Sequence, residues 1–453
     1  MEKNYISLES FEKIIKYNAK ENKFNILEFD RQNKDSTCFT HLSIFDDESR
    51  GTILEDKNKV EGLLDALINN SPKKKEILGG FSELEKGAIG SMLGMSIGDA
   101  MGSRLEFLPY IPEDKLDPKK ELKNMGEKAG GHFRLEPGQW TDDTSMGLCI
   151  ADSLLVNEGK LDQYDIMNRF IAWWIGGYNN AFRNNNKNNI PSRHSVGLGG
   201  NISLSFRQYI VSPVKETKAG NKNTSGNGSI MRNAAIPICF YYEIEKACKK
   251  AKEQSLTTHQ GIQAKECCNI LTYIVVKILN GEKLKDVLNN LKVKEILVDI
   301  DNNEIEENLS AYKSVISLIE SKTDESGEDW NWRKNEIYKY NKERARKQPG
   351  YIGSYAMDNL AMSLNIVYRA KSFEEAIIKA VNLRGDADSV ASVVGQIAGA
   401  AYPLESIPSD WIKSIKKWDD GQIALRGYML SRLYSGKSSY FKKKQKEEGI
   451  KQK

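Results

Sequence analysis

The sequence has few of the residues that build zinc, redox or disulfide sites. Its 453 residues include six cysteines and four histidines, and no two cysteines form a C-x-x-C pair. Zinc and redox motifs depend on such closely spaced cysteines, so the sequence indicates neither. We therefore expect reduced thiols, as in cytoplasmic proteins.

Long apolar runs are also absent. No stretch approaches the roughly 18 apolar residues of a membrane-spanning helix, and the first 20 residues lack the apolar centre of a secretory signal. We therefore expect a cytoplasmic protein with no membrane partner. Hydrophobic residues make up 40% of the chain and charged residues 28%, which is typical of a globular fold.

The excess of positive charge is confined to one end of the chain. Residues 436–453 carry seven lysines and two glutamates, a net charge of +5, whereas the whole chain carries +4. The other residues therefore sum to −1, so the composition does not favour a nucleic-acid partner. The lysine-rich end is expected to be a disordered tail, or else a weak contact for an anionic partner.

Composition divides the chain into three predicted parts. Residues 1–80 mix strand and helix patterns and are expected to form a small α+β appendage, which could serve as an interaction module. Residues 81–436 are expected to form the main domain, and residues 437–453 the basic tail. Within the appendage, the patterns predict helices at 8–17 and 59–70, strands at 23–29 and 38–45, and a linker at 71–80.

The main domain is predicted to be mainly all-α. SELE (82–85) and SFEE (372–375) have the S-x-x-E spacing of a capping box, which marks the start of a helix. The first of these helices is rich in glycine, alanine and serine, and Gly395 and Gly399 lie in a later apolar-periodic segment. Residues this small allow neighbouring backbones to approach closely.

Two short stretches place oxygen ligands at the start of a predicted helix. They are QWTDDTS (139–145) and RGDADSVAS (384–392). Carboxylate and hydroxyl oxygens suit Mg²⁺, Mn²⁺ or Ca²⁺ better than zinc or copper. The candidate ligands are Thr141, Asp142, Asp143, Asp386, Asp388 and Ser389.

These two stretches have a simpler interpretation as well. Thr or Asp before a helix is a common N-cap, and Asp in a first turn favours the helix dipole. If the four carboxylates are buried together, they need positive charge to stay ionised, and two divalent cations would supply it. Because 246 residues separate Asp142 from Asp388, the sequence alone does not show that they meet.

A glycine-rich stretch, SGNGSIMR (225–232), is a candidate for phosphate binding. Gly226, Asn227 and Gly228 could form a turn whose N–H groups point at a phosphate. An ordinary turn is the alternative. His259 is a candidate contact to the ligand, with a packed, structural histidine as the alternative.

Four stretches, in this order, resemble the ADP-ribosylglycohydrolase family. They are GMSIGDAMGSRLEF (94–107), PGQWTDDTSMGLCIADSLL (137–155), GNGSIMRNAAIPI (226–238) and NLRGDADSVASVVGQIAGAAYPLESIP (382–408). The resemblance covers residues 82–420 and leaves out residues 1–80. It implies an all-α domain with orthogonally packed helices, two Mg²⁺ or Mn²⁺ ions, and removal of ADP-ribose from a modified side chain of a protein, with arginine as the favoured acceptor.

The resemblance also implies roles for particular residues. It makes Thr141, Asp142 and Asp143, together with Asp386, Asp388 and Ser389, the metal ligands, with Asp388 bridging. Ser389 stands where the family usually has Thr, and it keeps the hydroxyl.

The remaining roles concern the chemistry and the bound substrate. Glu106 matches a mobile glutamate near the scissile bond, and either Glu106 or a water near Asp142 and Asp143 would lead the chemistry. Residues 226–228 match a loop that holds the diphosphate and distal ribose, and His259 matches a histidine near the nucleotide.

Other functions remain open at this point. The chain could be an immunity protein that neutralises an ADP-ribosylating toxin by binding it through residues 1–80, with or without hydrolysis. It could be a catalytically silent relative. It could also hydrolyse ADP-ribose linked to serine, to a nucleobase or to a small molecule.

Overall fold

The computed structural model describes residues 47–182, 195–218, 225–298, 306, 308–336, 338 and 348–434. Within these residues the chain forms seventeen α-helices and no β-strand, which confirms the prediction of a mainly all-α fold. The predicted helix at 8–17, both predicted strands and the basic tail lie outside the described residues.

The α-helices are, in chain order, α2 (Asp47–Ile68), α3 (Lys74–Gly79), α4 (Glu83–Gly102), α5 (Asp142–Val156), α6 (Gln163–Gly176), α7 (Gly200–Val211), α8 (Ala235–Cys239), α9 (Ile244–Leu256), α10 (Ile262–Leu279), α11 (Leu284–Asn289), α12 (Val293–Ile296), α14 (Leu309–Glu320), α16 (Ala356–Arg369), α17 (Phe373–Asn382), α18 (Ala387–Ala401), α19 (Ser409–Asp419) and α20 (Gln422–Arg432). Three short 3-10 helices join them: η2 (Glu113–Lys115), η4 (Pro349–Tyr351) and η5 (Leu404–Ser406).

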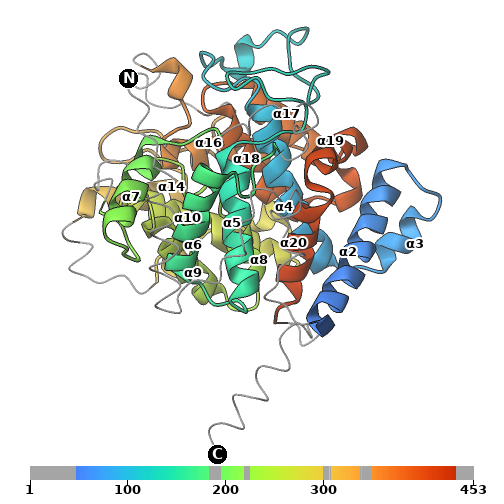
Figure 1. Ribbon diagram of the computed structural model, residues 1–453. Coiled ribbons are helices and arrows are strands. Elements are labelled where there is room, and N and C mark those ends of the chain that lie inside the picture. The colour runs from blue at the N-terminus through green and yellow to red at the C-terminus, as the bar shows by residue number, and fades with distance from the viewer. Residues whose placement is uncertain are drawn as a thin grey trace, which may run out of the picture.

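Helices α4 and α18 lie side by side at the centre of the domain and touch through their backbones (Figure 1). A side chain on Gly90, Gly94 or Gly98 would overlap a carbonyl oxygen of α18. One on Gly395 or Gly399 would overlap a carbonyl oxygen of α4. The contacts run in opposite directions along the two helices, so the end of α4 lies beside the start of α18. The close approach predicted from these glycines is therefore confirmed.

The two predicted capping boxes differ in detail. At the start of α4, Ser82 accepts the N–H of Glu85, and the Glu85 carboxylate accepts the N–H of Ser82, so this box is complete. At the start of α17, Ser372 accepts the N–H of Glu375 as expected. The Glu375 carboxylate, however, accepts the N–H of Lys371, one residue earlier than the box requires.

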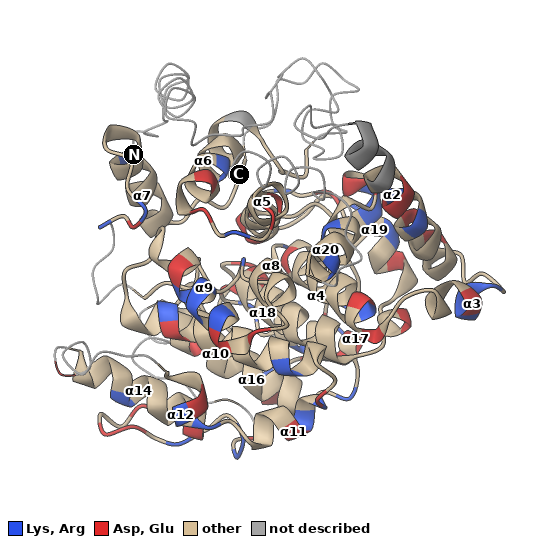
Figure 2. Cartoon of the chain, turned by 90° about the horizontal axis from the view of Figure 1, so that it is seen from below, with Lys and Arg blue, Asp and Glu red and all other residues tan. Residues whose placement is uncertain are grey.

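Charged residues are concentrated on the outer helices, and the helices at the centre are mostly apolar (Figure 2). Figure 2 marks charged residues on outer helices such as α9, α11 and α12, whereas α8 and α18 at the centre contain few. The residues of α5 are buried along its whole length. The five described cysteines are buried and unpaired. No helix in the described part of the chain is long and apolar enough to span a membrane.

Helix α2 packs against α19 and α20, and α3 packs against α2 (Figure 1). Ile53, Leu63 and Leu64 of α2 are at most 1% exposed, and Asp56 of α2 pairs with Arg432 of α20. The helix predicted at 59–70 overlaps α2, which begins earlier and ends at Ile68, and the segment 71–80 predicted as a linker contains α3. The domain boundary at residue 80 stays a prediction.

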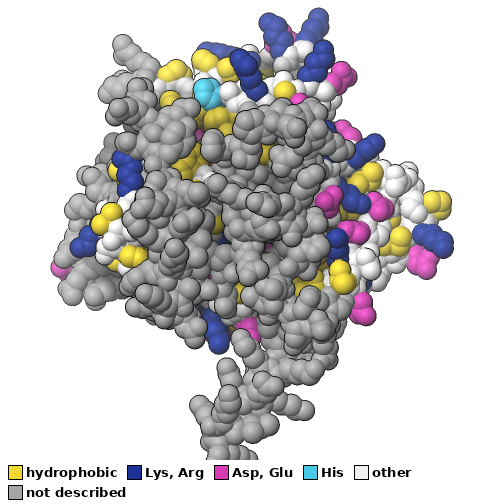
Figure 3. Space-filling view, viewed as in Figure 1, with side chains coloured by type: hydrophobic (Ala, Val, Ile, Leu, Met, Phe, Trp, Pro, Cys, Tyr) yellow, Lys and Arg dark blue, Asp and Glu magenta, His cyan; other side chains and the backbone are white. Residues whose placement is uncertain are grey.

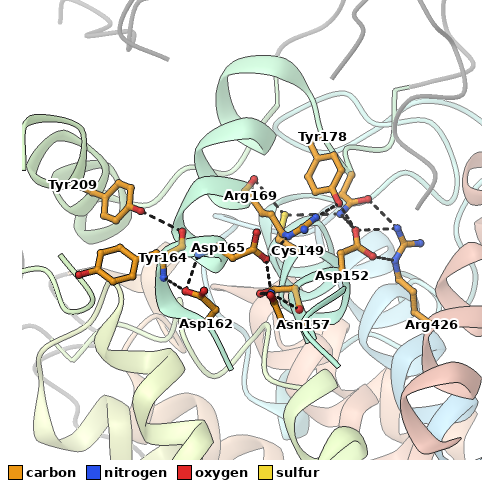
Figure 4. A network of polar contacts seen from close by, with 12 residues as sticks. Cys149, Asp152, Asn157, Asp162, Tyr164, Asp165, Arg169, Tyr178, Tyr209 and Arg426 are labelled. Carbon is orange, nitrogen blue, oxygen red and sulfur yellow. Dashed lines mark hydrogen bonds and ion pairs between the residues drawn. The ribbon is translucent and has the colours of Figure 1, made fainter. Parts of the chain in front are cut away.

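A buried ionic network fixes α5 against α6 and α20 (Figure 4). Asp152 of α5 accepts hydrogen bonds from Arg426 of α20 at 2.7 Å and from the Tyr178 hydroxyl at 2.6 Å. Arg169 of α6 donates to Asp165 at 2.7 Å and to Tyr178 at 2.8 Å. Burial by itself would raise the pKa of Asp152, but these guanidinium groups outweigh it and lower that pKa. The network therefore fixes the direction in which the start of α5 points.

The backbone contact predicts a large cost for adding one methyl group. Gly94→Ala would force α4 and α18 apart and is expected to lower the free energy of unfolding by about 2 kcal/mol or more. Gly62→Ala is the matched control, because Gly62 is exposed in α2 and has no atom within 4 Å of an added Cβ. It should stabilise the protein by about 0.5–1 kcal/mol through helix propensity. Urea denaturation measures both, and equal stability of Gly94→Ala and wild type would contradict the contact.

Candidate metal centre

Six buried carboxylates meet where α4, α5 and α18 come together. Each of these residues is at most 9% exposed. We call Asp99, Glu106, Asp142, Asp143, Asp386 and Asp388 the carboxylate centre. Asp99, Asp143 and Asp388 each offer an oxygen within 4.8 Å of the others. The structure thus brings together the two acidic stretches that the sequence places far apart.

The capping interpretation does not account for these side chains. Thr141 is the N-cap residue of α5 and Asp386 that of α18, yet neither side chain makes a capping hydrogen bond. The Thr141 hydroxyl instead donates to Asp99, and the Asp386 carboxylate accepts from Asn227 and Ser354. The positive ends of two helix dipoles face the carboxylates and partly offset their charge.

Asp99 is a member of the centre that the sequence analysis did not select. It lies in α4 and accepts hydrogen bonds from four donors, the N–H and the hydroxyl of both Thr141 and Thr144, at 2.6 to 3.2 Å. It therefore holds the first turn of α5 in place. Its position offered a clue, because a lone carboxylate in a helix of small and apolar residues needs a buried partner.

The carboxylates of the centre repel one another. Burial is the main cause that raises the pKa of four of them well above the usual range, and the negative charges of their neighbours are the next cause. These four are Glu106, Asp142, Asp143 and Asp388. Such a cluster stays ionised only with added positive charge.

Two buried oxygens of the centre have no hydrogen-bond donor, Oε2 of Glu106 and Oδ1 of Asp143. Unpaired buried carboxylate oxygens of this kind fit a hard divalent cation, which takes oxygen ligands. Two predicted ligands make other contacts: the Thr141 hydroxyl donates to Asp99 at 2.9 Å, and the Ser389 hydroxyl donates to the sulfur of Met231 at 3.5 Å. In both contacts the hydroxyl is the donor, so the lone pairs of its oxygen are not used by the hydrogen bond.

The glycine-rich loop touches the carboxylate centre through Asn227. The side-chain amide of Asn227 donates to Asp386 at 3.2 Å and to the carbonyl of Gly353 at 3.0 Å. Its backbone N–H donates to the carbonyl of Ser354 at 2.9 Å, and the Ser354 hydroxyl also donates to Asp386. Asn227 therefore sets the position of the loop relative to the centre.

His259 lies beneath the same loop and is 2% exposed. A Cβ on Gly228 would lie 2.8 Å from Cε1 of this ring, so the loop can pack here only because residue 228 is glycine. Burial, then the nearby charge of Arg232, lowers the pKa of His259 to about 3. Arg232 donates to the Thr258 hydroxyl at 2.8 Å, and that hydroxyl lies 2.9 Å from Nδ1 of His259. This favours a neutral ring with its proton on Nε2.

Of the residues predicted from the sequence, the structure thus groups the acidic ligands and Glu106 in one centre and Asn227 at its edge. Gly226 and Gly228 lie above His259, which is a packed residue that supports the loop. Whether any of them binds metal or substrate stays a prediction.

The comparisons with known proteins agree with the motifs. The family model described as ADP-ribosylglycohydrolase matches residues 82–438. ADP-ribosylarginine hydrolase Tri1 of Pseudomonas putida is 30% identical over 340 residues, which cover 72% of this chain and 74% of that protein. The ADP-ribosyl-(dinitrogen reductase) glycohydrolase of Rhodospirillum rubrum is 24% identical and is matched over 75% of this chain and 96% of its own length. A solved structure described as an ADP-ribosylglycohydrolase-related protein complex has a TM-score of 0.56 and 26% identity, and covers 78% of this chain and 100% of its own. The resemblance expected from the motifs is confirmed.

The carboxylate centre predicts that divalent cations stabilise the fold. Mg²⁺ or Mn²⁺ should raise the melting temperature of the wild type, because an ion that binds only the folded state stabilises it by an amount that grows with the logarithm of the ion concentration once this exceeds the Kd. Asp388→Asn should lose most of this rise. Asp410→Asn changes an exposed carboxylate of α19 and should keep it. Thermal melts with and without EDTA measure the effect, and an equal rise in both variants would contradict the centre.

The rise in melting temperature that Mg²⁺ or Mn²⁺ produces should also depend on pH. A carboxyl whose pKa is raised by folding binds its proton more tightly in the folded chain, so its contribution to stability falls as pH rises. Relative to Asp388→Asn, the metal-free wild type should therefore lose stability as pH rises above about 4, where a carboxyl of the unfolded chain titrates, and Mg²⁺ should restore it.

Proposed function

Because the family match spans residues 82–438, this chain belongs to the ADP-ribosylglycohydrolase family, and we propose that it is a metal-dependent hydrolase that removes ADP-ribose from modified arginine side chains of proteins. The observation that carries the proposal is the meeting of two acidic helix starts in one buried centre. The arginine acceptor follows from the relative that is named an ADP-ribosylarginine hydrolase.

In this proposal two divalent cations, Mg²⁺ or Mn²⁺, are held by the first turns of α5 and α18. The candidate ligands are Thr141, Asp142, Asp143, Asp386, Asp388 and Ser389. When bound, such ions polarise ligand oxygens and orient the vicinal hydroxyls of a ribose. Asp99 keeps its hydrogen bonds to α5 and acts as the residue that orients these ligands.

Glu106 is the proposed general acid. Burial and the charges of Asp386 and Asp142 raise the pKa of Glu106, so its carboxyl holds a proton more readily than an exposed glutamate does. Cleavage of the bond at C1 of the ribose passes through a cation-like state and leaves a guanidine that must gain a proton. Glu106 can supply that proton, while Asp142 or Asp143 orients the attacking water and accepts its proton.

The glycine-rich loop is the proposed site for the diphosphate. The N–H and the side-chain amide of Asn227 already bind Ser354 and Asp386, so Asn227 would hold the shape of the loop. The flanking Gly226 and Gly228 would then meet the phosphates, with the neutral His259 beneath them. A glycine turn of this kind suits an anion because no side chain blocks its N–H groups.

Release of free ADP-ribose from defined substrates tests this proposal. The wild type should release ADP-ribose from an arginine-linked peptide with Mg²⁺ or Mn²⁺, and EDTA should stop the release. Asp142→Asn should lower kcat/KM by about 100-fold or more, as expected for the loss of a metal ligand.

Asp410→Asn, on the exposed surface of α19, serves as the control and should keep full activity. If ADP-ribose is released only from a serine-linked peptide, the acceptor is serine and the proposed arginine linkage is wrong. Full turnover by Asp142→Asn, or turnover unaffected by EDTA, would refute the role of the centre.

A second candidate function uses the first part of the chain. The family match begins at residue 82, so the preceding residues could bind a toxin that attaches ADP-ribose and block it, as an immunity protein would. Helix α2 is packed against α19 and α20, so removing it would expose apolar surface. The sharper variant therefore removes residues 1–46 only. Loss of toxin binding with hydrolysis retained would support this function, whereas unchanged binding would exclude residues 1–46 as the contact.

A further inference from the structure

Four aromatic side chains gather directly after Glu106. We call Phe107, His132, Phe133 and Tyr351 the aromatic rim. The ring centroid of Phe107 lies 5.4 Å from that of His132, 6.5 Å from that of Phe133 and 5.2 Å from that of Tyr351. Phe107 is thus the ring to which the other three are joined.

The rim faces solvent, although large rings normally pack inward. Tyr351 is 57% exposed, His132 is exposed, and Phe107 and Phe133 are half-buried. Figure 3 shows hydrophobic side chains and a histidine side by side on the upper part of the molecule, where Figure 1 places the loop that follows α4. Grouped exposed rings of this kind are typical of a binding surface.

Backbone hydrogen bonds tie the rim to the carboxylate centre. The N–H of Phe107 donates to the carbonyl of Gly385 at 2.8 Å. The N–H of the next residue, Asp386, donates to the carbonyl of Ile352 at 2.8 Å, and Ile352 directly follows Tyr351. The rim and the acidic start of α18 are therefore held as one unit.

The backbone of Phe107 is strained. Its φ of 63° lies in the left-handed region, which bulky residues rarely adopt. Glycine would adopt it without strain. A phenylalanine kept at such a position, half exposed and beside reactive groups, indicates that its ring has a function there.

We propose, resting on the function proposed above, that the aromatic rim stacks on the guanidinium of the acceptor arginine and so selects arginine-linked ADP-ribose. A guanidinium is planar, permanently charged and weakly hydrated, and it stacks well on aromatic faces. A serine acceptor offers no such group. The rim is a specificity element and takes no part in proton transfer.

Kinetics with two linkages test the rim. In Phe107→Leu and Tyr351→Leu, kcat/KM for an arginine-linked peptide should fall about fivefold, the effect of losing one cation–π contact. The inhibition constant of free ADP-ribose, and any turnover of a serine-linked peptide, should stay the same. Phe107→Tyr keeps an aromatic ring, so its kcat/KM for the arginine-linked peptide should be close to that of the wild type. Tyr242→Leu removes an aromatic side chain, 40% exposed, that lies outside the rim, and should have no effect.

A binding measurement separates the rim from the proposed function. Arginine amide is titrated into protein saturated with ADP-ribose and followed by calorimetry, with lysine amide as the control. The wild type should bind arginine amide about fivefold more tightly than Tyr351→Leu. If this difference holds while neither peptide is hydrolysed, the proposed function fails and the rim stands. If the wild type and Tyr351→Leu bind arginine amide equally, the proposed role of the rim is wrong. It is also wrong if the rim variants lose kcat/KM equally for both linkages and bind free ADP-ribose more weakly, because the adenine ring would then lie on the rim.

Discussion

The backbone contact between α4 and α18 is the constraint on which the site depends. Ordinary helix pairs lie 8–10 Å apart, because side chains separate them. Here glycines at every fourth position leave no side chain between the helices, so neither helix can slide or rotate without a clash. That register places Asp99, near the end of α4, and Glu106, in the turn after it, beside Asp386 and Asp388 at the start of α18. The carboxylates of the centre lie close together because the backbones of α4 and α18 are in contact.

The molecule buries charge in two opposite ways. Around Asp152, the guanidinium groups of Arg426 and Arg169 compensate the carboxylate, and the network holds three helices together. In the carboxylate centre the charges are alike, and Glu106 and Asp143 each keep an oxygen without a donor. Breaking the first network would leave an uncompensated charge and unfold structure. The second is costly in itself, which fits a centre built to hold cations, as proposed above.

Sequence patterns predicted the local features better than the long-range ones. The box at Ser82 and the close approach of glycine-rich helices follow from spacing alone, and both are confirmed. The same glycines could not tell which helix would be the partner. Asp99 was overlooked because its role depends on Thr141 and Thr144, which approach it only in the folded chain. The meeting of Asp142 with Asp388 was an inference from the family resemblance, since 246 residues separate them.

Asp386 joins the parts that surround the centre. Its carboxylate accepts from Asn227 of the glycine-rich loop and from Ser354, and its N–H binds the carbonyl of Ile352. The residue before it, Gly385, accepts the N–H of Phe107. A ligand that shifts either the loop or the aromatic rim therefore pulls on the same residue at the start of α18. The glycine-rich loop, the aromatic rim and the geometry of the carboxylates are thus mechanically linked, because one short turn carries all of these bonds.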